Sequence, residues 1–363
     1  MAARKKKVVK APRRTAARSG GLGVLLAAIV KKHGAGSARI IEEEEVKERV
    51  STGIDVLDHY VLGDGGLPVG KILELAGANN TGKTSLAYCI VGAWQRAGGL
   101  VCWADPELSF DDQRAKTLGV DVSQVIMLDA ETLDALLEEF KTVLAAHDGR
   151  VPLLIVWDSV AAAVSAAAEK KAAGERTVGD VAALLSQELK KIIKPLRRKR
   201  GFLLALNQTR DNIGVMFGDK TTTPGGNAMK FYASQRLQIF GGKAVKTATG
   251  AHIAKIVTVV AIKNRFAAPF RKAKIRLDYA TGYNNIWSTV WHAKLLKLIK
   301  PREGGFSGPS QEGLATYAQA VHKLKWPIEV DKSAAPPEED DEDIVIAVDG
   351  EDDEPDVADD SEE

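Results

Sequence analysis

Apolar runs and helical stretches alternate through the middle of the chain. The strand-like runs, rich in Val, Ile and Leu, cover residues 71–77, 100–105, 125–128, 152–158 and 201–208. Stretches with a helical pattern lie between them and cover residues 83–97, 111–118, 132–146 and 178–199. Strands that are apolar on both faces and joined by helical crossovers predict a mostly parallel sheet flanked by helices, which is an α/β fold.

The pattern changes after the last of these runs. Residues 209–227 are polar and contain glycines, and together they are long for a connection inside a compact domain. Loops of that length are usually functional or disordered. Strand-like runs at 233–240, 253–263 and 273–279 then follow with short connections, so we expect them to extend the sheet with antiparallel pairs.

Charge is distributed unevenly along the chain. Residues 1–18 hold eight basic residues and no acidic one, and residues 338–363 hold sixteen acidic residues and no basic one. The whole chain carries a net charge of +2, so the part between these tails carries +10. A basic body of this kind indicates a polyanionic partner, although charge alone fits many proteins.

These patterns divide the chain into five expected parts. Proline and acidic residues dominate the end of the chain, and an apolar helix with a charged connector precedes the core. The parts are a disordered basic tail (1–20), the helix and connector (21–50), the α/β core (51–280), a small C-terminal domain (281–333) and a disordered acidic tail (334–363).

Several classes of protein are disfavoured. Cys89 and Cys102 lie in apolar runs without metal-type or disulfide-type spacing, which indicates buried thiols in a reducing compartment. The six histidines form no zinc-ligand pattern. The apolar runs are shorter than the roughly 20 residues of a membrane-spanning helix, so no membrane partner is expected. We expect a cytoplasmic protein, with organelle targeting by the basic leader left open.

A phosphate-binding loop follows the first strand-like run. Residues 77–84, GANNTGKT, match G-x-x-x-x-G-K-[ST] and open a helix. Backbone N–H groups of such a loop face phosphates, and the helix N-terminus adds the positive end of its dipole. Lys83 is expected to reach the β- and γ-phosphates of ATP, and the Thr84 hydroxyl to help hold Mg²⁺. The expected nucleotide-binding residues here are Gly77, Ala78, Asn79, Asn80, Thr81, Gly82, Lys83, Thr84 and Ser85.

Two carboxylates are expected beside this loop. Asp158 ends the run at 152–158, where a second Mg²⁺ ligand belongs. Glu107 follows the run at 100–105, and the carboxyl ends of neighbouring parallel strands meet at one crevice. A carboxylate there orients or deprotonates the attacking water, whereas the alternative for Glu107 is a solvated loop acid.

Longer segments carry a family resemblance. Residues 50–77, 105–121 and 153–162 (VSTGIDVLDHYVLGDGGLPVGKILELAG, DPELSFDDQRAKTLGVD and LLIVWDSVAA), with the more specific 207–237 (NQTRDNIGVMFGDKTTTPGGNAMKFYASQRL) and 263–270 (KNRFAAPF), resemble the RecA family of DNA recombinases. Phage recombinases of the same type are included. The resemblance covers residues 21–280 and implies a RecA-type P-loop core, with the family's catalytic glutamate at Glu107.

The resemblance also implies roles at the nucleotide. Gln208 corresponds to the residue that senses the γ-phosphate and signals to the DNA loop, so Glu107, Lys83 and Gln208 are the expected catalytic residues. Lys263 and Arg265 resemble the basic pair that reaches a neighbour's ATP across the filament interface. Arg114 stands where the family stacks an aromatic on adenine, and a guanidinium can also stack on a base. The helix at 21–32 resembles the element that packs on the adjacent subunit; alternatively, it packs on its own core.

The segment 209–227 resembles the family's second DNA-binding loop. Ile213 stands where the family inserts an apolar side chain between base triplets. Met216 and Phe217 are either anchors of this loop or residues that pack in the core. The first DNA loop, around 165–178, matches poorly, and Ala183 stands in place of a family arginine. The expected DNA-binding residues are Arg210, Asn212, Ile213, Gly214, Met216, Phe217, Thr222, Thr223, Gly225, Gly226, Asn227 and Lys190.

The function implied is ATP-dependent homologous recombination. A DNA-dependent ATPase with Mg²⁺ would form a helical homo-oligomeric filament on single-stranded DNA and pair it with a homologous double-stranded DNA during repair. Single-strand-binding and loader proteins are further expected partners. Two alternatives stay open: a filament or mediator protein without strand exchange, and a RecA-fold repair ATPase or helicase-type motor. Trp287 and Trp291 near the C-terminus either bind duplex DNA or pack.

Overall fold

The computed structural model describes residues 19–34, 37–38, 48–63, 65–162, 178–211, 221–298, 320–321 and 323–324. The chain forms two compact units, residues 1–48 and 49–363. The expected tails lie outside the described residues, apart from the start of α1. None of the described helices is long and apolar enough to cross a membrane.

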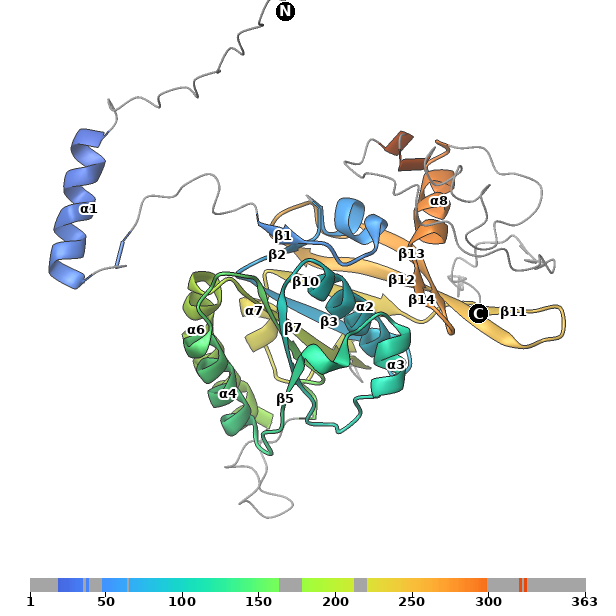
Figure 1. Cartoon of the computed structure of the whole chain (residues 1–363), viewed down its shortest axis with the longest axis horizontal. Helices are drawn as coiled ribbons and strands as arrows, with labels where there is room; N and C mark the ends of the chain where they lie inside the picture. The colour runs from blue at the N-terminus through green and yellow to red at the C-terminus, as the bar shows by residue number, and fades with distance from the viewer. Residues whose placement is uncertain are drawn as a thin grey trace, which may run out of the picture. The chain divides into compact units, whose positions relative to one another are not determined.

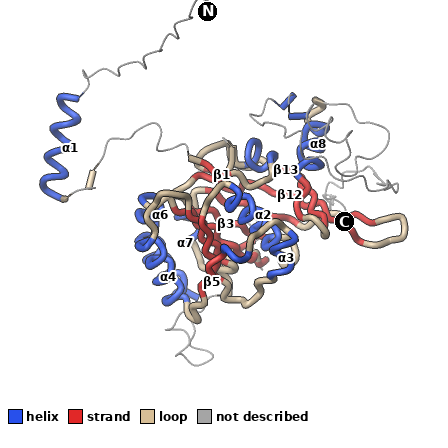
Figure 2. Tube along the Cα trace, in the orientation of Figure 1, coloured by secondary structure: helices blue, strands red, loops and turns tan. Residues whose placement is uncertain are grey.

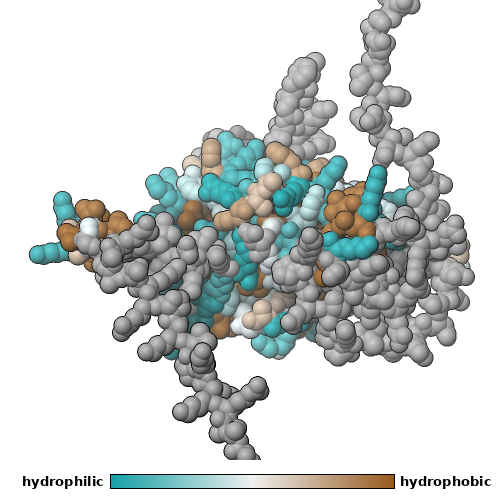
Figure 3. Space-filling view, turned by 90° about the horizontal axis from the view of Figure 1, so that it is seen from above, coloured by the Kyte–Doolittle hydropathy of each residue, from teal (hydrophilic) through white to brown (hydrophobic). Residues whose placement is uncertain are grey.

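The first unit contains the predicted apolar helix, α1 (Ser19–His33) (Figure 1). Its apolar side chains Leu22, Val24 and Leu25 are exposed, and apolar atoms lie beside hydrophilic ones on its surface (Figure 3). Lys31, Lys32 and His33 close the helix, where positive charge interacts favourably with the negative end of the helix dipole. The helix therefore has an exposed apolar surface.

The second unit is built on a ten-stranded sheet in the order β14-β13-β12-β10-β3-β7-β6-β4-β5, with β11 beside β12. The parallel strands are β3 (Ile72–Gly77), β4 (Leu100–Ala104), β5 (Val125–Leu128), β6 (Leu153–Trp157), β7 (Gly201–Gln208) and β10 (Gln235–Phe240). The antiparallel strands are β11 (Ala244–Lys246), β12 (His252–Asn264), β13 (Lys272–Asp278) and β14 (Gly282–Asn284). The α/β fold with a mostly parallel sheet is confirmed.

The expected antiparallel extension of the sheet is confirmed, because β10 pairs antiparallel with β12 and β12 with β13. The join to the rest of the sheet was not foreseen: β10 pairs parallel with β3. A long connection that includes α7 (Ala228–Tyr232) leads from β7 across β3 to β10. Such a connection permits a crossover, whereas a short turn permits only a hairpin. Antiparallel pairing therefore begins with β12.

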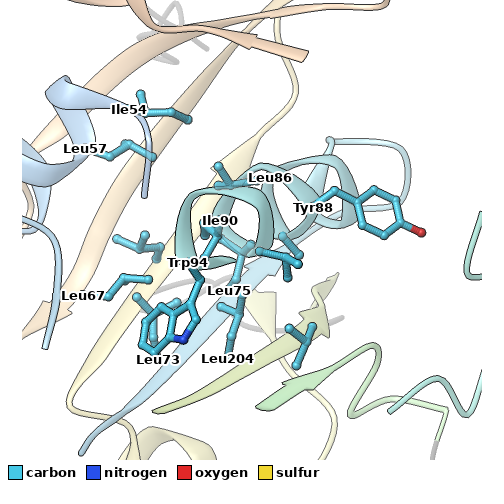
Figure 4. Close-up of a cluster of buried hydrophobic side chains, with 14 of the residues drawn as sticks. Ile54, Leu57, Leu67, Leu73, Leu75, Leu86, Tyr88, Ile90, Trp94 and Leu204 are labelled. Atoms are coloured by element: carbon cyan, nitrogen blue, oxygen red, sulfur yellow. The ribbon is translucent and has the colours of Figure 1, made fainter. Parts of the chain in front are cut away.

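Helices cover both faces of the sheet (Figures 1 and 2). One apolar layer includes Leu73, Leu75 and Leu204 of the strands, and α2 (Lys83–Arg96) packs on it through Leu86, Ile90 and Trp94 (Figure 4). The other layer packs α4 (Leu133–Ala146), α6 (Val178–Arg198) and α7 on the opposite face. Successive strand residues point to opposite faces, which explains why the predicted runs are apolar throughout.

Shorter elements complete the unit. The π-helix η3 (Val56–Val61) and helix α8 (Asn285–Leu295) both contact β13. Helix α3 (Asp112–Thr117) begins at Asp111, whose side chain accepts a hydrogen bond from the Arg114 amide. The remaining elements are β1 (Arg49–Val50), β2 (Leu67–Pro68), the 3-10 turn η4 (Val122–Gln124), β8 (Arg210–Asp211) and β9 (Thr221–Thr222).

Candidate nucleotide-binding site

The carboxyl ends of four neighbouring parallel strands form one edge of the sheet. Strands β3, β7, β6 and β4 are adjacent, and their register places Gly77 beside Gln208 and Ala104 beside Trp157. The chain leaves each strand at this edge and delivers polar residues there, as parallel sheets generally do. We call this region the strand-end edge; it carries most of the expected catalytic groups.

The loop between β3 and α2 has the geometry of a phosphate cradle. Asn80 and Gly82 have positive φ values of 59° and 101°. A Cβ on Gly77 would lie 2.7 Å from the Ile239 carbonyl oxygen and 2.8 Å from Thr81 Oγ1, so only glycine fits there. The loop therefore curls tightly before the N-terminus of α2, an arrangement that favours an anion.

Lys83 is folded over this cradle. Its Nζ donates to the carbonyl oxygens of Gly77, at 3.1 Å, and Ala78, at 2.9 Å. Burial lowers the pKa of Lys83, while the charges of Asp158 and Glu107 act in the opposite direction. A partly desolvated ammonium held by carbonyl groups at the mouth of the loop fits a phosphate ligand, which would supply stronger charge-assisted partners.

Thr84 and Asp158 meet beside the loop. Thr84 Oγ1 donates to Asp158 Oδ2 over 2.8 Å. The pKa of Asp158 is raised to about 6, chiefly by burial and also by the charges of Glu107 and Asp105, while Thr84 and Lys83 oppose the shift. A buried carboxylate beside a hydroxyl supplies the oxygen ligands that Mg²⁺ prefers, and a divalent cation would stabilise the ionised form. The two residues fit Mg²⁺ held jointly with nucleotide phosphates.

Glu107 is held by residues from two other strand ends. Ser159, which follows β6, donates its hydroxyl to Glu107 Oε1, and Gln208 Nε2 donates to the same oxygen over 3.3 Å. Glu107 is exposed, and these two hydrogen bonds hold its carboxylate at the strand-end edge. The strand-end edge thus brings together the residues expected at the hydrolysis site, namely Lys83, Thr84, Glu107, Asp158 and Gln208.

Arg114 and the phosphate loop each contact residues of the antiparallel part of the sheet. Its Nη1 donates to the backbone oxygen of Tyr279, which follows β13 and is 38% exposed. Lys255 of β12 donates from Nζ to the Asn80 carbonyl oxygen, and the Tyr283 hydroxyl donates to the Gly82 oxygen over 3.3 Å. Sequence reasoning missed Lys255 and Tyr283, because the positions of β12 and β14 in the sheet bring them to the loop.

In the part of the chain that the structure describes, Lys263 and Arg265 contact helix α7 rather than the phosphate loop. Lys263 Nζ donates to the Lys230 oxygen over 2.6 Å, and both Lys263 and Arg265 donate to the Phe231 oxygen, over 3.3 and 3.4 Å. Within the described residues, both basic side chains therefore contact α7, and neither contacts the phosphate loop of its own chain.

The expected DNA segment is described only at its ends. Arg210 pairs with Thr222 and Asp211 with Thr221, which gives the segment an antiparallel stem of β8 and β9. Asn212, Ile213, Gly214, Met216 and Phe217 lie outside the described residues, as does most of the expected first DNA loop.

The glycines that follow the stem pack closely on α6. Gly225 and Gly226 have positive φ values of 86° and 63°, and a Cβ on them would lie 2.9 Å from Leu185 and 2.8 Å from Ala182. The observed close approach of both glycines is to helix α6. Thr223 is buried, while Asn227, before α7, and Lys190, on α6, are exposed.

The C-terminal tryptophans stack on each other. The ring centroids of Trp287 and Trp291 are 5.1 Å apart with an interplanar angle of 9°, and Trp287 is buried. The packing alternative therefore describes Trp287.

The chain is similar to known proteins in sequence and in fold. The family model described as RecA N-terminal domain matches residues 21–284. Protein RecA of Chloroherpeton thalassium is 34% identical over 311 residues, which cover 84% of this chain and 86% of that protein. A solved structure of the RadB recombinase is 20% identical and covers 64% of this chain and 97% of its own, with a TM-score of 0.48.

Proposed function

Since the chain belongs to the RecA family of recombination proteins, we propose that it is a DNA-dependent ATPase that forms filaments on single-stranded DNA and exchanges strands with a homologous duplex. The observation that carries the proposal is the contact between Gln208 and Glu107 at the strand-end edge. Gln208 ends β7, and the expected DNA segment begins at the next residue. Hydrolysis and DNA binding therefore share one backbone junction.

The hydrolysis chemistry follows from the positions of the side chains. Lys83 would neutralise charge on the terminal phosphates, and Thr84 with Asp158 would hold Mg²⁺, which would stabilise the negative charge that develops during phosphoryl transfer. The Glu107 carboxylate would orient the attacking water and accept its proton. Ser159 keeps that carboxylate directed at the edge.

Two surfaces support assembly into a filament. Strand β5 ends the described sheet on one side, and its Ile126 and Met127 are 61% and 36% exposed. An apolar strand edge of this kind pairs readily with another chain. The exposed apolar residues of α1 supply a complementary surface, and Lys263 with Arg265 would reach the ATP of a neighbouring subunit.

A strand-exchange assay tests this function. The purified protein, ATP, Mg²⁺, a single-stranded oligonucleotide and a labelled duplex are combined, with the duplex either homologous or unrelated. We expect release of the labelled strand from the homologous duplex only, and none with Lys83→Ala. Release that is absent for the wild type, or equal for both duplexes, contradicts the proposal and favours a filament protein or a motor.

A further inference from the structure

A buried ionic group lies directly behind Gln208. Glu74, in the middle of β3, is 0% exposed although apolar residues flank it on both sides. Its Oε2 is ion-paired with Arg236 Nε from β10, and its Oε1 accepts a hydrogen bond from Asn207 Nδ2 of β7 over 2.9 Å. The carboxylate is therefore bonded to both neighbouring strands.

The side-chain amide of Asn207 also contacts Gln208 and the end of the expected DNA segment. Its Nδ2 also donates to the Pro224 carbonyl oxygen over 3.1 Å, at the end of the expected DNA segment. Its Oδ1 accepts a hydrogen bond from the Gln208 backbone N–H over 3.0 Å. One amide thus contacts the residue that bonds Glu107 and the point where the chain returns from the DNA segment.

The Glu74–Arg236 ion pair also lies close to Lys263. Arg236 lies opposite Lys263 in the register of β10 and β12. The pKa of Lys263 is lowered by burial and by the charges of Arg265 and Arg236, while Glu74 raises it. The buried carboxylate consequently acts electrostatically on the side chain that would reach a neighbouring subunit.

Stability alone is a weak reason for such a group. Burying an ion pair costs desolvation that its attraction scarcely repays, and apolar side chains of similar volume often do as well. We infer that Asn207, anchored by the Glu74–Arg236 ion pair, is a positioning residue that couples the Gln208 contact at the nucleotide to the DNA segment at Pro224. This inference rests on the proposed DNA-dependent ATPase function and adds the residue that transmits the signal.

The chain contains a matched control group. Arg276 Nε contacts Asp278 Oδ1 at 2.7 Å, Asn284 Nδ2 donates to Asp278 Oδ2 over 2.9 Å, and Asn284 Oδ1 accepts from the Trp287 N–H over 2.8 Å. The hydrogen bonds are similar, but here the asparagine caps α8. Replacing Asn284 removes equivalent hydrogen bonds without touching Gln208 or the DNA segment.

The experiment compares Asn207→Ala with Asn284→Ala in the full chain. Fluorescence anisotropy gives the affinity for a labelled single strand with a non-hydrolysable ATP analogue and with ADP, and the ratio of the two measures coupling. We expect Asn207→Ala to reduce this ratio by about tenfold while its DNA-free affinity for a fluorescent ADP analogue changes less than about threefold. Asn284→Ala should keep the wild-type ratio even if its melting temperature falls as much.

The outcomes separate the two proposals. If the wild type shows the ATP dependence and Asn207→Ala retains it, or Asn284→Ala loses it equally, the inference is wrong and the proposed function stands. If the wild type binds DNA equally with both nucleotides, the proposed function is wrong, and the inference, which rests on it, is wrong as well. Should Asn207→Ala not fold, the double variant Glu74→Gln/Arg236→Gln removes both buried charges together, and it should show the same loss of ratio.

Discussion

Two arginine–carboxylate–asparagine groups with similar hydrogen bonds lie in different parts of the sheet, and the asparagine of the first also donates to the Pro224 carbonyl oxygen. Arg236, Glu74 and Asn207 join β10, β3 and β7 next to the strand-end edge. The second group, Arg276, Asp278 and Asn284, joins β13, β14 and the start of α8. The first asparagine accepts from the amide of Gln208, and the second from an amide in the first turn of a helix.

We expect the location of each group to decide what its hydrogen bonds do. The first group contacts Gln208, which donates to Glu107, so changes there should alter the reaction. Where η3 and α8 cover β13, which we call the η3–α8 layer, the same bonds hold one element to another. Changes there should alter stability and leave hydrolysis per folded molecule almost unchanged.

The largest effect is expected from Glu107→Gln. The amide keeps the size of the side chain but cannot accept a proton, and general-base catalysis contributes about 100- to 10,000-fold. We expect DNA-stimulated hydrolysis to fall by about 100-fold or more, with nucleotide affinity retained. Asp278→Asn is the matched change in the η3–α8 layer, and steady-state kinetics should show near wild-type turnover. Comparable losses in both variants would erase the distinction between the regions.

A pair of glycine substitutions gives the next effect. Gly77→Ala places a Cβ against Ile239 and Thr81, so the phosphate loop must shift, and we expect nucleotide affinity to fall by about tenfold or more. Gly66→Ala places a Cβ 2.5 Å from the Val50 oxygen at a φ of +118°. It should cost about 1–3 kcal/mol of unfolding free energy. Nucleotide titration and thermal unfolding separate the two; reduced affinity in the Gly66 variant at a temperature where it is folded would contradict this.

The smallest effect is expected in the pH dependence of the unfolding free energy, through His292 in the η3–α8 layer. Burial lowers the pKa of His292 from 6.5 to about 4. Between these pH values the unfolded chain binds a proton that the folded chain does not, so stability falls as the pH falls. His292→Gln should remove up to about 2 kcal/mol of the stability difference between pH 7 and pH 5, measured by denaturant unfolding.

The wild type is the necessary reference for that measurement. Burial raises the pKa of Asp58 in η3 to about 6, so its contribution to stability runs in the opposite direction over the same range. The fold stimulation of hydrolysis by DNA should be equal for wild type and His292→Gln at pH 7. An unchanged pH slope in the variant would show that His292 is not the group responsible.

Much of the fold and of the hydrolysis site was predictable because both depend on local sequence. A strand buried on both faces is an uninterrupted apolar run, and the phosphate loop occupies consecutive residues, 77–84. Asp158 and Glu107 were predictable for a further reason. Each follows a parallel strand, and parallel strands deliver such residues to a common edge.

What could not be predicted depends on pairing between distant strands. The position of β10 beside β3 follows from a crossover whose path the residues of 209–234 do not specify. Glu74 stands in an apolar run, and its partners Asn207 and Arg236 are 133 and 162 residues away in the chain. Only the order β10-β3-β7 makes them neighbours. The contact of Lys255 with Asn80 likewise requires the position of β12 in the sheet.

The central claim is that the strand-end edge couples ATP hydrolysis to single-stranded DNA. The most direct measurement is the rate of ATP hydrolysis by the purified protein with and without single-stranded DNA, with Lys83→Ala as the blank. The account predicts strong stimulation by single strands, weaker stimulation by duplex DNA and no activity in the variant. Hydrolysis that is indifferent to DNA, or that persists in Lys83→Ala, would contradict it.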